Sequence, residues 1–546
     1  MIKKGSNSPD MDVNAGIASY IILDAYSSGY VPVRICVAGW RSFDLDAFGL
    51  MKQEYVRETL HQKEGVTLDR LFTVPLGNRD KSVSDMYVRE SHQGAVFSTN
   101  TYFGCFDCTA YANHTSIKKV RVCVKGSDNP HLIHVDQNGR ETIVDISNDI
   151  TVPIDQYNSG YLYVKCVEGG CPEEIWYEGD GEVKPVKLAI IICTYRREDM
   201  VRRNLEILMN TIQADPLLRE DVTVICVDNG RTLTEVPDGV RLIPNPNYGG
   251  SGGYARGMME AEVCTHFWLM DDDIAFEPTM FRRILTFLKY RKRESVRLAA
   301  GMFSFEQPTV QHEATASFDG YTFHSNCFGL DFVDSGVLLK NGIPENSKHQ
   351  YGGWWSIVVP NTGDLPMPFF IKLDDVEYGL RSTDYAIMNG FGVWHEAFGK
   401  KGNAWSEYYT TRNTLILQSM YPDLGHSAVK MMSVRLLKAL AYGEPKCMEA
   451  ALKGVEDYLV GAEAFSAIDP EEKHREIMRA YGARLAEDMI RGKMLKAAAR
   501  NLIKCRGCIA KYLKALHLLY RAKGPDRAWT KMTSKDFWVR YLKLTD

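Results

Sequence analysis

The sequence has little of what marks a secreted or membrane-spanning protein. It begins MIKKGSNSPDMD, without the apolar run that a signal peptide needs, and no window approaches the ~18 apolar residues of a spanning helix. Its 13 cysteines are odd in number and scattered, so they do not form the pattern of a disulfide framework. These absences predict a cytoplasmic protein with reduced thiols.

Net charge is also small, −4 over 546 residues, but it is unevenly spread. From Arg491 onward there are 15 Lys and Arg against 3 Asp, so this tail carries +12 and the rest of the chain −16. A basic tail with interleaved apolar residues fits the surface of an anionic membrane, or else a solvated helical face. The interleaved residues are Leu495, Leu502, Ile503, Leu513, Leu516, Leu518, Leu519, Trp529, Phe537, Trp538 and Leu542.

The sequence pattern divides the chain into four parts. After a leader, residues 1–18, short β-rich runs broken by turn residues predict an antiparallel β-sandwich over residues 19–170. Continuous apolar runs then alternate with helical segments. This predicts a doubly wound α/β domain over residues 185–415, with ligands at the carboxyl ends of its strands. Residues 416–546 have apolar positions at helical spacing and predict a helical C-terminal domain with the basic amphipathic tail.

Three consecutive aspartates, Asp271, Asp272 and Asp273, end a short apolar strand in THFWLMDDDIAFE. Carboxylates at a strand tip repel one another unless a cation lies between them, and Mg²⁺ or Mn²⁺ prefers such oxygen ligands. A solvated acidic loop that caps the next helix is the alternative. His395, in GFGVWHEAFGK, is a candidate for a further ligand, although a lone histidine is more often structural.

A nucleotide site is predicted at the ends of the neighbouring strands. Thr194 and Arg196 follow the first strand of the α/β domain, and Asp228 follows the second. These are positions where polar side chains of such folds meet a nucleotide.

A glycine-rich stretch, NPNYGGSGGYARG, follows the second of these strands. We expect a loop around Gly250, bracketed by Asn247 and Arg256, whose backbone can approach phosphates. A tight strand-to-helix turn explains one or two of its glycines. A dinucleotide fingerprint does not fit, because the loop follows the second strand and lacks the GxGxxG spacing.

A second acidic cluster lies further along the chain. In PMPFFIKLDDVEYGLR an apolar strand ends in Asp374 and Asp375, and Glu377 follows on the next helix. One metal site plus one general base would explain two acidic clusters, because an attacking glycosyl acceptor hydroxyl must lose a proton. Helix capping is the alternative. Before this cluster, Trp354 and Trp355 either offer indole faces to a sugar ring or belong to the core.

Taken in order, these stretches resemble the bacterial family 2 glycosyltransferases with a GT-A fold, and among them the polymerising galactofuranosyltransferases that build galactan. The matching segments are CTYRR, VDNG, NYGGSGGYARGM, WLMDDDI, GWW, FFIKLDDVEYGLR, VWH and WSEYYTTRN. The β-rich part before them looks like the sandwich that these enzymes carry. The chain is a few residues shorter than the family between Asp375 and His395, which concerns the acceptor side.

The resemblance implies an inverting transfer of galactofuranose from UDP-galactofuranose to a lipid-linked or oligosaccharide acceptor, in the synthesis of cell-surface polysaccharide. It implies that Asp271, Asp273 and His395 bind Mn²⁺ or Mg²⁺. A lipid-linked acceptor would place the protein at the inner face of the cell membrane, in peripheral contact with it.

The same resemblance implies Asp375 as the general base, with Asp374 and Glu377 shaping the acceptor site. The residues and the resemblance together give two further sets of site residues, one that contacts the donor and one that contacts the acceptor. The expected donor contacts are Thr194, Arg196, Asp228, Asn247, Gly250, Arg256 and Asp272, and the expected acceptor contacts are Trp354 and Trp355.

Two other functions stay open at this point. A related family 2 transferase, such as a rhamnosyltransferase, would use another nucleotide sugar. The sequence leaves this alternative open, because recognition of a furanose ring depends on the shape of the pocket.

A non-catalytic protein that binds zinc or an anionic surface is the alternative of another class. The pairs Cys105–Cys108 and Cys505–Cys508 have the spacing within each pair that zinc sites use, provided that the fold brings the pairs together. We expect no nucleic-acid partner, and homo-oligomer formation stays open.

Overall fold

The computed structural model describes residues 22–23, 35–36, 68–77, 81–90, 96–127, 129–167, 171–261, 263–344, 348–396, 402–485, 491–522 and 527–544. The chain divides into two compact units, residues 1–68 and 69–546. In the first unit, β1 (Ile22–Leu23) pairs antiparallel with β2 (Ile35–Cys36). The predicted leader and most of the first part of the predicted sandwich, up to residue 68, lie outside the described residues.

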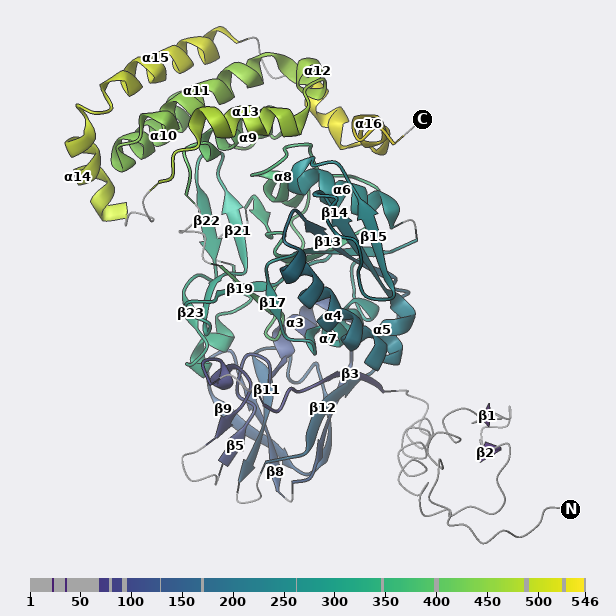
Figure 1. The fold of residues 1–546 in the computed structure, drawn as a ribbon. Helices are drawn as coiled ribbons and strands as arrows, with labels where there is room; N and C mark the ends of the chain where they lie inside the picture. The colour runs from purple at the N-terminus through teal and green to yellow at the C-terminus, as the bar shows by residue number, and fades with distance from the viewer. Residues whose placement is uncertain are drawn as a thin grey trace, which may run out of the picture. The chain divides into compact units, whose positions relative to one another are not determined.

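The second unit begins with two antiparallel sheets. One has the order β10 (Asp149–Pro153), β7 (Lys119–Lys125), β12 (Glu174–Gly179), β3 (Asp69–Thr73). The other has the order β4 (Arg89–Glu90), β5 (Val96–Ser98), β11 (Tyr161–Val167), β8 (Pro130–Val135), β9 (Glu141–Ile146), and β6 (Phe106–Asp107) pairs with β11. Strands of both sheets contribute to one buried cluster, and Figure 1 shows them side by side in the purple to blue part of the chain. Between the strands lie η2 (Ser84–Met86) and α3 (Cys108–His114).

A seven-stranded sheet follows and carries most of the candidate site. Its order is β15 (Val240–Pro244), β14 (Val222–Asp228), β13 (Leu188–Thr194), β16 (His266–Asp271), β25 (Ser356–Pro360), β18 (Arg297–Ala299), β26 (Tyr385–Ala386). The first four strands are parallel, and β25 runs antiparallel to β16 and β18. Helices α4 (Glu198–Ala214), α5 (Pro216–Asp221), α6 (Gly249–Glu260) and α7 (Met280–Lys289) connect the strands, which confirms the predicted α/β alternation.

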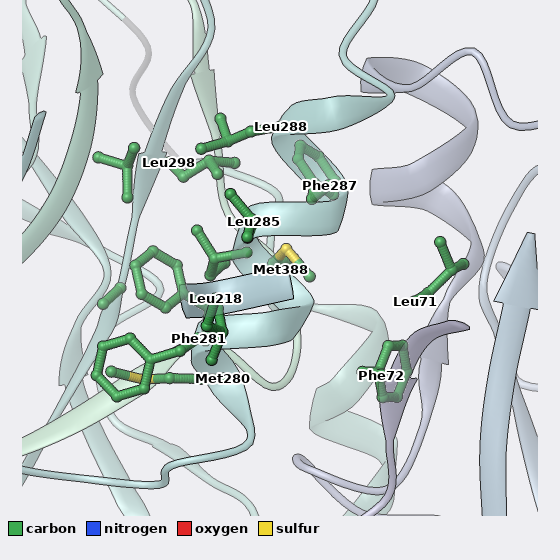
Figure 2. Close-up of a cluster of buried hydrophobic side chains, with 14 of the residues drawn as sticks. Leu71, Phe72, Leu218, Met280, Phe281, Leu285, Phe287, Leu288, Leu298 and Met388 are labelled. Atoms are coloured by element: carbon green, nitrogen blue, oxygen red, sulfur yellow. The ribbon is translucent and has the colours of Figure 1, made fainter. Parts of the chain in front are cut away.

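The apolar run of β13 has a simple physical explanation. Ile190 and Ile192 lie in one buried cluster, and Ala189 and Ile191 lie in another, so alternate side chains of β13 fill cores on the two faces of the sheet. Helix α7 packs in the first of these cores. Figure 2 shows its side chains between Leu218 and Leu298 on one side and Leu71 and Phe72 of β3 on the other.

Two smaller sheets complete the region around the site. One has the order β17 (Ala275–Phe276), β27 (Gly392–His395), β19 (Gly301–Ser304), β20 (Val310–Glu313), β23 (Leu330–Asp331). The other is β22 (Phe323–Asn326), β21 (Thr315–Phe318), β24 (Gln350–Tyr351). The remaining elements here are η3 (Ser335–Leu339) and α8 (Asp374–Leu380).

The rest of the chain is helical. Helices α9 (Ser406–Met420), α10 (Ala428–Tyr442), α11 (Pro445–Leu459), α12 (Gly461–Ser466), α13 (Pro470–Tyr481), α14 (Arg491–Asn501) and α15 (Arg506–Arg521) precede η5 (Arg527–Thr533) and α16 (Lys535–Tyr541). Helix α16 packs against the α/β part: Trp538 Nε1 donates to the carbonyl oxygen of Pro366 at 2.9 Å. No helix in the described part of the chain is both long and apolar enough to span a bilayer.

The basic tail is less uniformly exposed than its composition predicts. Trp529, Trp538 and Leu542 are buried in the clusters beneath η5 and α16, so they do not belong to a membrane-facing surface. Leu516, Leu518 and Leu519 pack partly against the helical core. The exposed members of the predicted set are Leu495, Leu502, Ile503 and Leu513, on α14, α15 and the turn between them.

Candidate active site

The aspartates that end β16 meet His395, which ends β27. Ligand atoms of Asp271, Asp273 and His395 all lie within 4.8 Å of one another. His395 Nε2 lies 3.3 Å from Asp273 Oδ1. The short strand β17 pairs with β27, Ala275 opposite Trp394, and this pairing brings the two distant segments together.

These three side chains fit a divalent cation. Two carboxylates and an imidazole are a donor set that Mn²⁺ accepts. His395 Nδ1 lies 2.6 Å from the carbonyl oxygen of Glu396, which favours the tautomer whose Nε2 lone pair faces Asp273. Burial, and then the charge of Asp273, raise the pKa of Asp271 to about 6, and a bound cation would relieve that repulsion. Among the described residues this is the one such group of potential ligands.

Asp272 is not part of that cluster and accepts hydrogen bonds from two side chains. Thr194 Oγ1 donates to it at 2.6 Å, and Arg197 NH1 donates at 2.7 Å. The same Arg197 atom lies 2.8 Å from Asp273 Oδ2, so one guanidinium bridges two of the three aspartates. Thr194 is therefore a support for Asp272, and Arg197 is the arginine that pairs with these carboxylates, while a donor contact by Arg196 stays a prediction. Arg196 is exposed, with its guanidinium 5.1 Å from the centre of the Tyr195 ring.

The other predicted donor contacts lie at the same edge of the sheet, but their polar atoms are largely engaged. Asp228 is 1% exposed and accepts backbone N–H bonds from Gly230, Thr232 and Leu233. Asn247 Oδ1 accepts from the Gly249 N–H, and Arg256 pairs with Glu260 at 2.8 Å. Each therefore shapes its own turn or helix, and direct contact with a nucleotide stays a prediction for all three.

The glycine-rich stretch is helical, not the loop that the sequence predicts. Helix α6 begins at Gly249, and its glycines allow it to lie directly on the sheet. A Cβ atom on Gly253 would lie 2.1 Å from Cys193 Sγ, and one on Gly257 would lie 2.3 Å from Ile191 Cγ2. Close packing therefore requires these glycines. Gly250 differs, because the only atom near its Cβ position is Asp374 Oδ2, at 3.4 Å.

The second acidic cluster therefore lies beside the first turn of α6, but it does not end an apolar strand as the sequence predicts, because residues 364–373 have no regular secondary structure. Asp374 and Asp375 open α8, and Asp375 Oδ1 accepts from the Val376 N–H at 2.8 Å. Burial raises the pKa of Asp375 to about 6, against the backbone bond of Val376 and the nearby charge of Lys372, which both lower it. Burial and the charge of Asp375 raise the pKa of Asp374 further. Asp375 therefore loses its proton more readily, and Asp374 retains its proton to higher pH.

Glu377 and Glu313 complete this side of the site in different ways. Glu377 is fully buried and pairs with Arg381, accepts from the Tyr421 hydroxyl at 2.9 Å, and accepts from the Met367 N–H at 3.3 Å. Glu377 therefore holds the start of α8 through internal partners, and a part in shaping an acceptor site stays a prediction. Glu313, on β20, was not predicted from the sequence. Its pKa is raised to about 7, by burial and by the charge of Asp375, and Ser325 donates to it.

The two tryptophans lie in the core. Trp354 and Trp355 are each 6% exposed. The Trp354 ring packs edge-on against Tyr254, with centroids 4.9 Å apart, and Trp355 Nε1 donates to the carbonyl oxygen of Ala300. A sugar platform needs an open indole face, so this burial argues against the predicted acceptor role. Trp355 instead supports the metal cluster through its carbonyl oxygen, which accepts from the Asp271 N–H at 3.2 Å.

The two CxxC pairs do not meet. Cys105 and Cys108 are buried near the N-terminal sheets, and Cys505 and Cys508 are buried in the helical core. Burial raises the pKa of Cys108 well above its ordinary value, which keeps this thiol protonated. The fold therefore offers no four-cysteine zinc site from these residues.

Comparisons with known proteins concern the family of this chain. Residues 189–312 match the sequence model of the family described as Glycosyl transferase family 2. The galactofuranosyltransferase GlfT2 of Mycobacterium tuberculosis (strain ATCC 25618 / H37Rv) is 28% identical over 433 residues, which cover 67% of this chain and 66% of the relative. GlfT2 of Mycolicibacterium smegmatis (strain ATCC 700084 / mc(2)155) is 27% identical over 330 residues, which cover 54% and 50%. The chain thus spans between half and two thirds of these relatives.

Similarity to solved structures is weaker. Staphylococcus aureus TarS 1–349 aligns at 11% identity with a TM-score of 0.32, over 60% of this chain and 91% of the TarS chain. GalNAc-T7 with UDP, GalNAc and Mn²⁺ aligns at 9% identity with a TM-score of 0.30, over 52% and 56%. From the sequence comparisons, the chain carries a family 2 glycosyltransferase domain and resembles the mycobacterial galactofuranosyltransferases.

Proposed function

We propose that this protein transfers a galactofuranosyl residue from UDP-galactofuranose to a hydroxyl group of a glycan acceptor, with inversion at the anomeric carbon. One observation carries the proposal: two acidic clusters from distant parts of the chain meet across the first turn of α6. Gly250 lies beside Asp374 Oδ2. Cys193 lies beneath α6, and the charges of Asp272, Asp271 and Asp374 all raise the pKa of its thiol. A single displacement needs a metal-binding set and a general base in one site.

The donor side is assigned to the strand ends of the large sheet. Asp271, Asp273 and His395 would hold a divalent cation, which when bound neutralises charge on the diphosphate of the departing UDP. Arg197 adds a fixed positive charge next to these carboxylates. Together with the bound cation, Arg197 would offset the negative charge of the carboxylates and of the departing UDP.

The acceptor side is assigned to the start of α8. Asp375 takes the proton of the acceptor hydroxyl as its oxygen bonds to the anomeric carbon and the bond from that carbon to UDP breaks. Its raised pKa keeps it basic enough for this step and still ionised near neutral pH. Asp374 keeps its proton longer and donates a hydrogen bond to a sugar hydroxyl. No covalent glycosyl intermediate is needed, so the product has the opposite anomeric configuration to the donor.

A panel of donors tests this proposal. UDP release is measured with Mn²⁺ and a synthetic galactofuranosyl oligosaccharide, using UDP-galactofuranose, UDP-galactopyranose and dTDP-rhamnose. We expect acceptor-dependent turnover of the furanose donor alone, and an inverted anomeric signal in the NMR spectrum of the product. Turnover of the rhamnose donor in its place would overturn the assigned donor, and a retained configuration would overturn the mechanism.

We further propose that the exposed apolar face of α14 and α15 contacts an anionic membrane from its cytoplasmic side. Ile503, between the two helices, is 85% exposed, and Leu495 on α14 is 71% exposed. Ile509, Leu513 and Tyr520 recur on one face of α15 and are exposed as well. The basic residues nearby are Lys496, Arg500, Lys504, Arg506 and Lys511. Exposed apolar side chains within a basic field are typical of an interfacial surface.

Co-sedimentation with vesicles tests this contact. We expect the full chain to bind phosphatidylglycerol-containing vesicles at low salt, to release at high salt, and to ignore phosphatidylcholine vesicles. Ile503→Glu with Leu513→Glu should abolish binding. Ile143→Glu, at an equally exposed apolar position on β9, should not. Binding that survives the double substitution would exclude this face.

A further inference from the structure

The backbone just before the acidic pair is held in a conformation that most residues avoid. Phe370, Lys372 and Leu373 have φ angles of 70°, 68° and 63°, in the left-handed region. Leu373 immediately precedes Asp374, so this turn sets the direction from which both carboxylates enter the site. A disfavoured turn at such a position persists only when its neighbours hold it.

Asn413, on α9, holds this turn from one side. Its Nδ2 group donates to the carbonyl oxygens of Ile371, at 3.2 Å, and Lys372, at 2.7 Å. Its Oδ1 atom accepts from Arg412 Nε at 2.9 Å, so the amide faces the turn with its two donors. The side chain has no exposed surface.

Two further groups hold the turn. Arg412 NH2 donates to the carbonyl oxygen of Phe369 at 3.0 Å, and its guanidinium lies 4.8 Å from the centre of the Phe465 ring. On the opposite side, the N–H of Phe370 donates to Ser251 Oγ of α6 at 2.9 Å. The turn is therefore fixed between the helical part of the chain and the glycine-rich helix.

The metal-binding turn is held in the same way from another helix. Asn204, on α4, donates through Nδ2 to the carbonyl oxygens of Asp272, at 3.0 Å, and Ile274, at 2.8 Å. It is 2% exposed. Each acidic turn of the site thus has one buried asparagine that donates to two of its carbonyl oxygens.

We propose that Asn413 and Asn204 are positioning residues, Asn413 for the acceptor carboxylates Asp374 and Asp375 and Asn204 for the metal-binding turn. The expected changes in kcat and KM rest on the proposed function. The expected changes in nucleotide affinity and in hydrogen exchange of the two turns do not. The two asparagines act on different halves of the reaction. Their loss therefore produces different defects, whereas two merely structural asparagines would produce the same one.

Asn413→Ala should lower kcat about 100-fold, because a misplaced base no longer meets the acceptor hydroxyl, while the donor KM stays within about twofold. Asn204→Ala should weaken binding of UDP with Mn²⁺ about tenfold, as expected when a group behind a metal ligand is lost. A matched control is Asn501, whose Nδ2 donates to the carbonyl oxygens of Leu440 and Ala441 at 2.9 and 3.1 Å, far along the chain from both turns. Asn501→Ala should change neither quantity.

The test combines titration calorimetry of UDP with Mn²⁺, steady-state kinetics, and hydrogen exchange of the peptides that cover residues 266–276 and 366–378, all on the full chain. We expect faster exchange at 366–378 in Asn413→Ala alone, and at 266–276 in Asn204→Ala alone. Asn413→Asp, which replaces the donating group with an acceptor, repeats the test if the alanine variant does not fold. Equal losses of nucleotide affinity in both variants, or unchanged exchange at 366–378 in either Asn413 variant, would overturn the proposal.

The calorimetric and exchange results do not depend on the sugar that the protein transfers. If wild-type protein fails to turn over UDP-galactofuranose, the proposed donor is wrong, while the separate effects on nucleotide binding and on the 366–378 turn still decide the roles of the two asparagines.

Discussion

Gly249 contacts the turn that precedes Asp374 through backbone atoms alone: a Cβ atom at Gly249 would lie 1.9 Å from the carbonyl oxygen of Phe370. The first residue of the glycine-rich helix is thus in direct contact with the segment that presents the acidic pair. Its φ angle of 71° adds a second reason for glycine. The proposed donor and acceptor halves of the site therefore meet at a point where no side chain fits.

Gly249→Ala should accordingly reduce activity at least tenfold, because the Phe370 carbonyl must move and carry Asp374 and Asp375 with it. Steady-state kinetics with the thermal midpoint measured in parallel checks this. Gly363→Ala is the control, since Gly363 also has a positive φ, 81°, but nothing lies near its Cβ position. Equal activity losses in the two variants would show that backbone strain, not the contact with Phe370, is responsible.

Activity should rise with pH through about 6, because Asp375 acts in its ionised form and burial raises its pKa to about that value. The profile is measured as kcat at saturating Mn²⁺, since the raised pKa of Asp271 weakens metal binding in the same range. Lys372 lowers the pKa of Asp375, so Lys372→Met should move the acid limb to higher pH. An acid limb that does not move would mean that another group controls it.

Arg197→Met should tighten binding of Mn²⁺ in the absence of nucleotide, by about tenfold, because the guanidinium next to Asp272 and Asp273 opposes a cation. Titration calorimetry with the metal alone measures this. Arg203, on helix α4 that Arg197 precedes, is not part of the site and supplies the control substitution Arg203→Met. Weaker metal binding in Arg197→Met would show instead that this arginine holds the carboxylates in place for the metal.

Trp355→Phe should lower stability without changing kcat by more than about twofold. The substitution removes the bond from Nε1 to Ala300 and part of a buried ring, a loss of roughly 1–3 kcal/mol in the free energy of unfolding. Urea denaturation and acceptor KM are measured together. A raised acceptor KM with unchanged stability would restore the sugar-platform role that the burial argues against.

The parts of the site that the sequence predicts are those written in short contiguous segments. β13 and β16 are buried apolar runs that the sequence predicts as strands, and polar residues follow directly at their ends: Thr194 at the end of β13 and the three aspartates at the end of β16. The first aspartate cluster and His395 stand at the ends of β16 and β27, whereas the strand predicted before Asp374 and Asp375 is wrong, because the residues before them form an irregular turn. The grouping of Asp271, Asp273 and His395 in space depends on the pairing of β17 with β27, which the sequence does not predict.

What the sequence does not reveal depends on contacts between distant residues. A glycine-rich stretch predicts a loop from local propensity, but packing on Cys193 and Ile191 makes it a helix. The sequence of a tryptophan pair does not show whether other side chains cover the faces of its indole rings. Asn204 and Asn413 carry no local signature, because an asparagine within a helix reveals its role only through the carbonyl oxygens that the fold brings to it.

The central claim is that Asp375 takes the acceptor proton beside a metal-bound nucleotide. The most direct measurement compares wild-type protein and Asp375→Asn in transfer from UDP-galactofuranose to a galactofuranosyl acceptor, with the affinity for UDP and Mn²⁺ measured on the same samples. We predict a loss in kcat of about 10²–10⁴-fold with nucleotide affinity unchanged, as expected for a general base. Transfer within tenfold of wild type, or a loss confined to nucleotide affinity, would contradict the account.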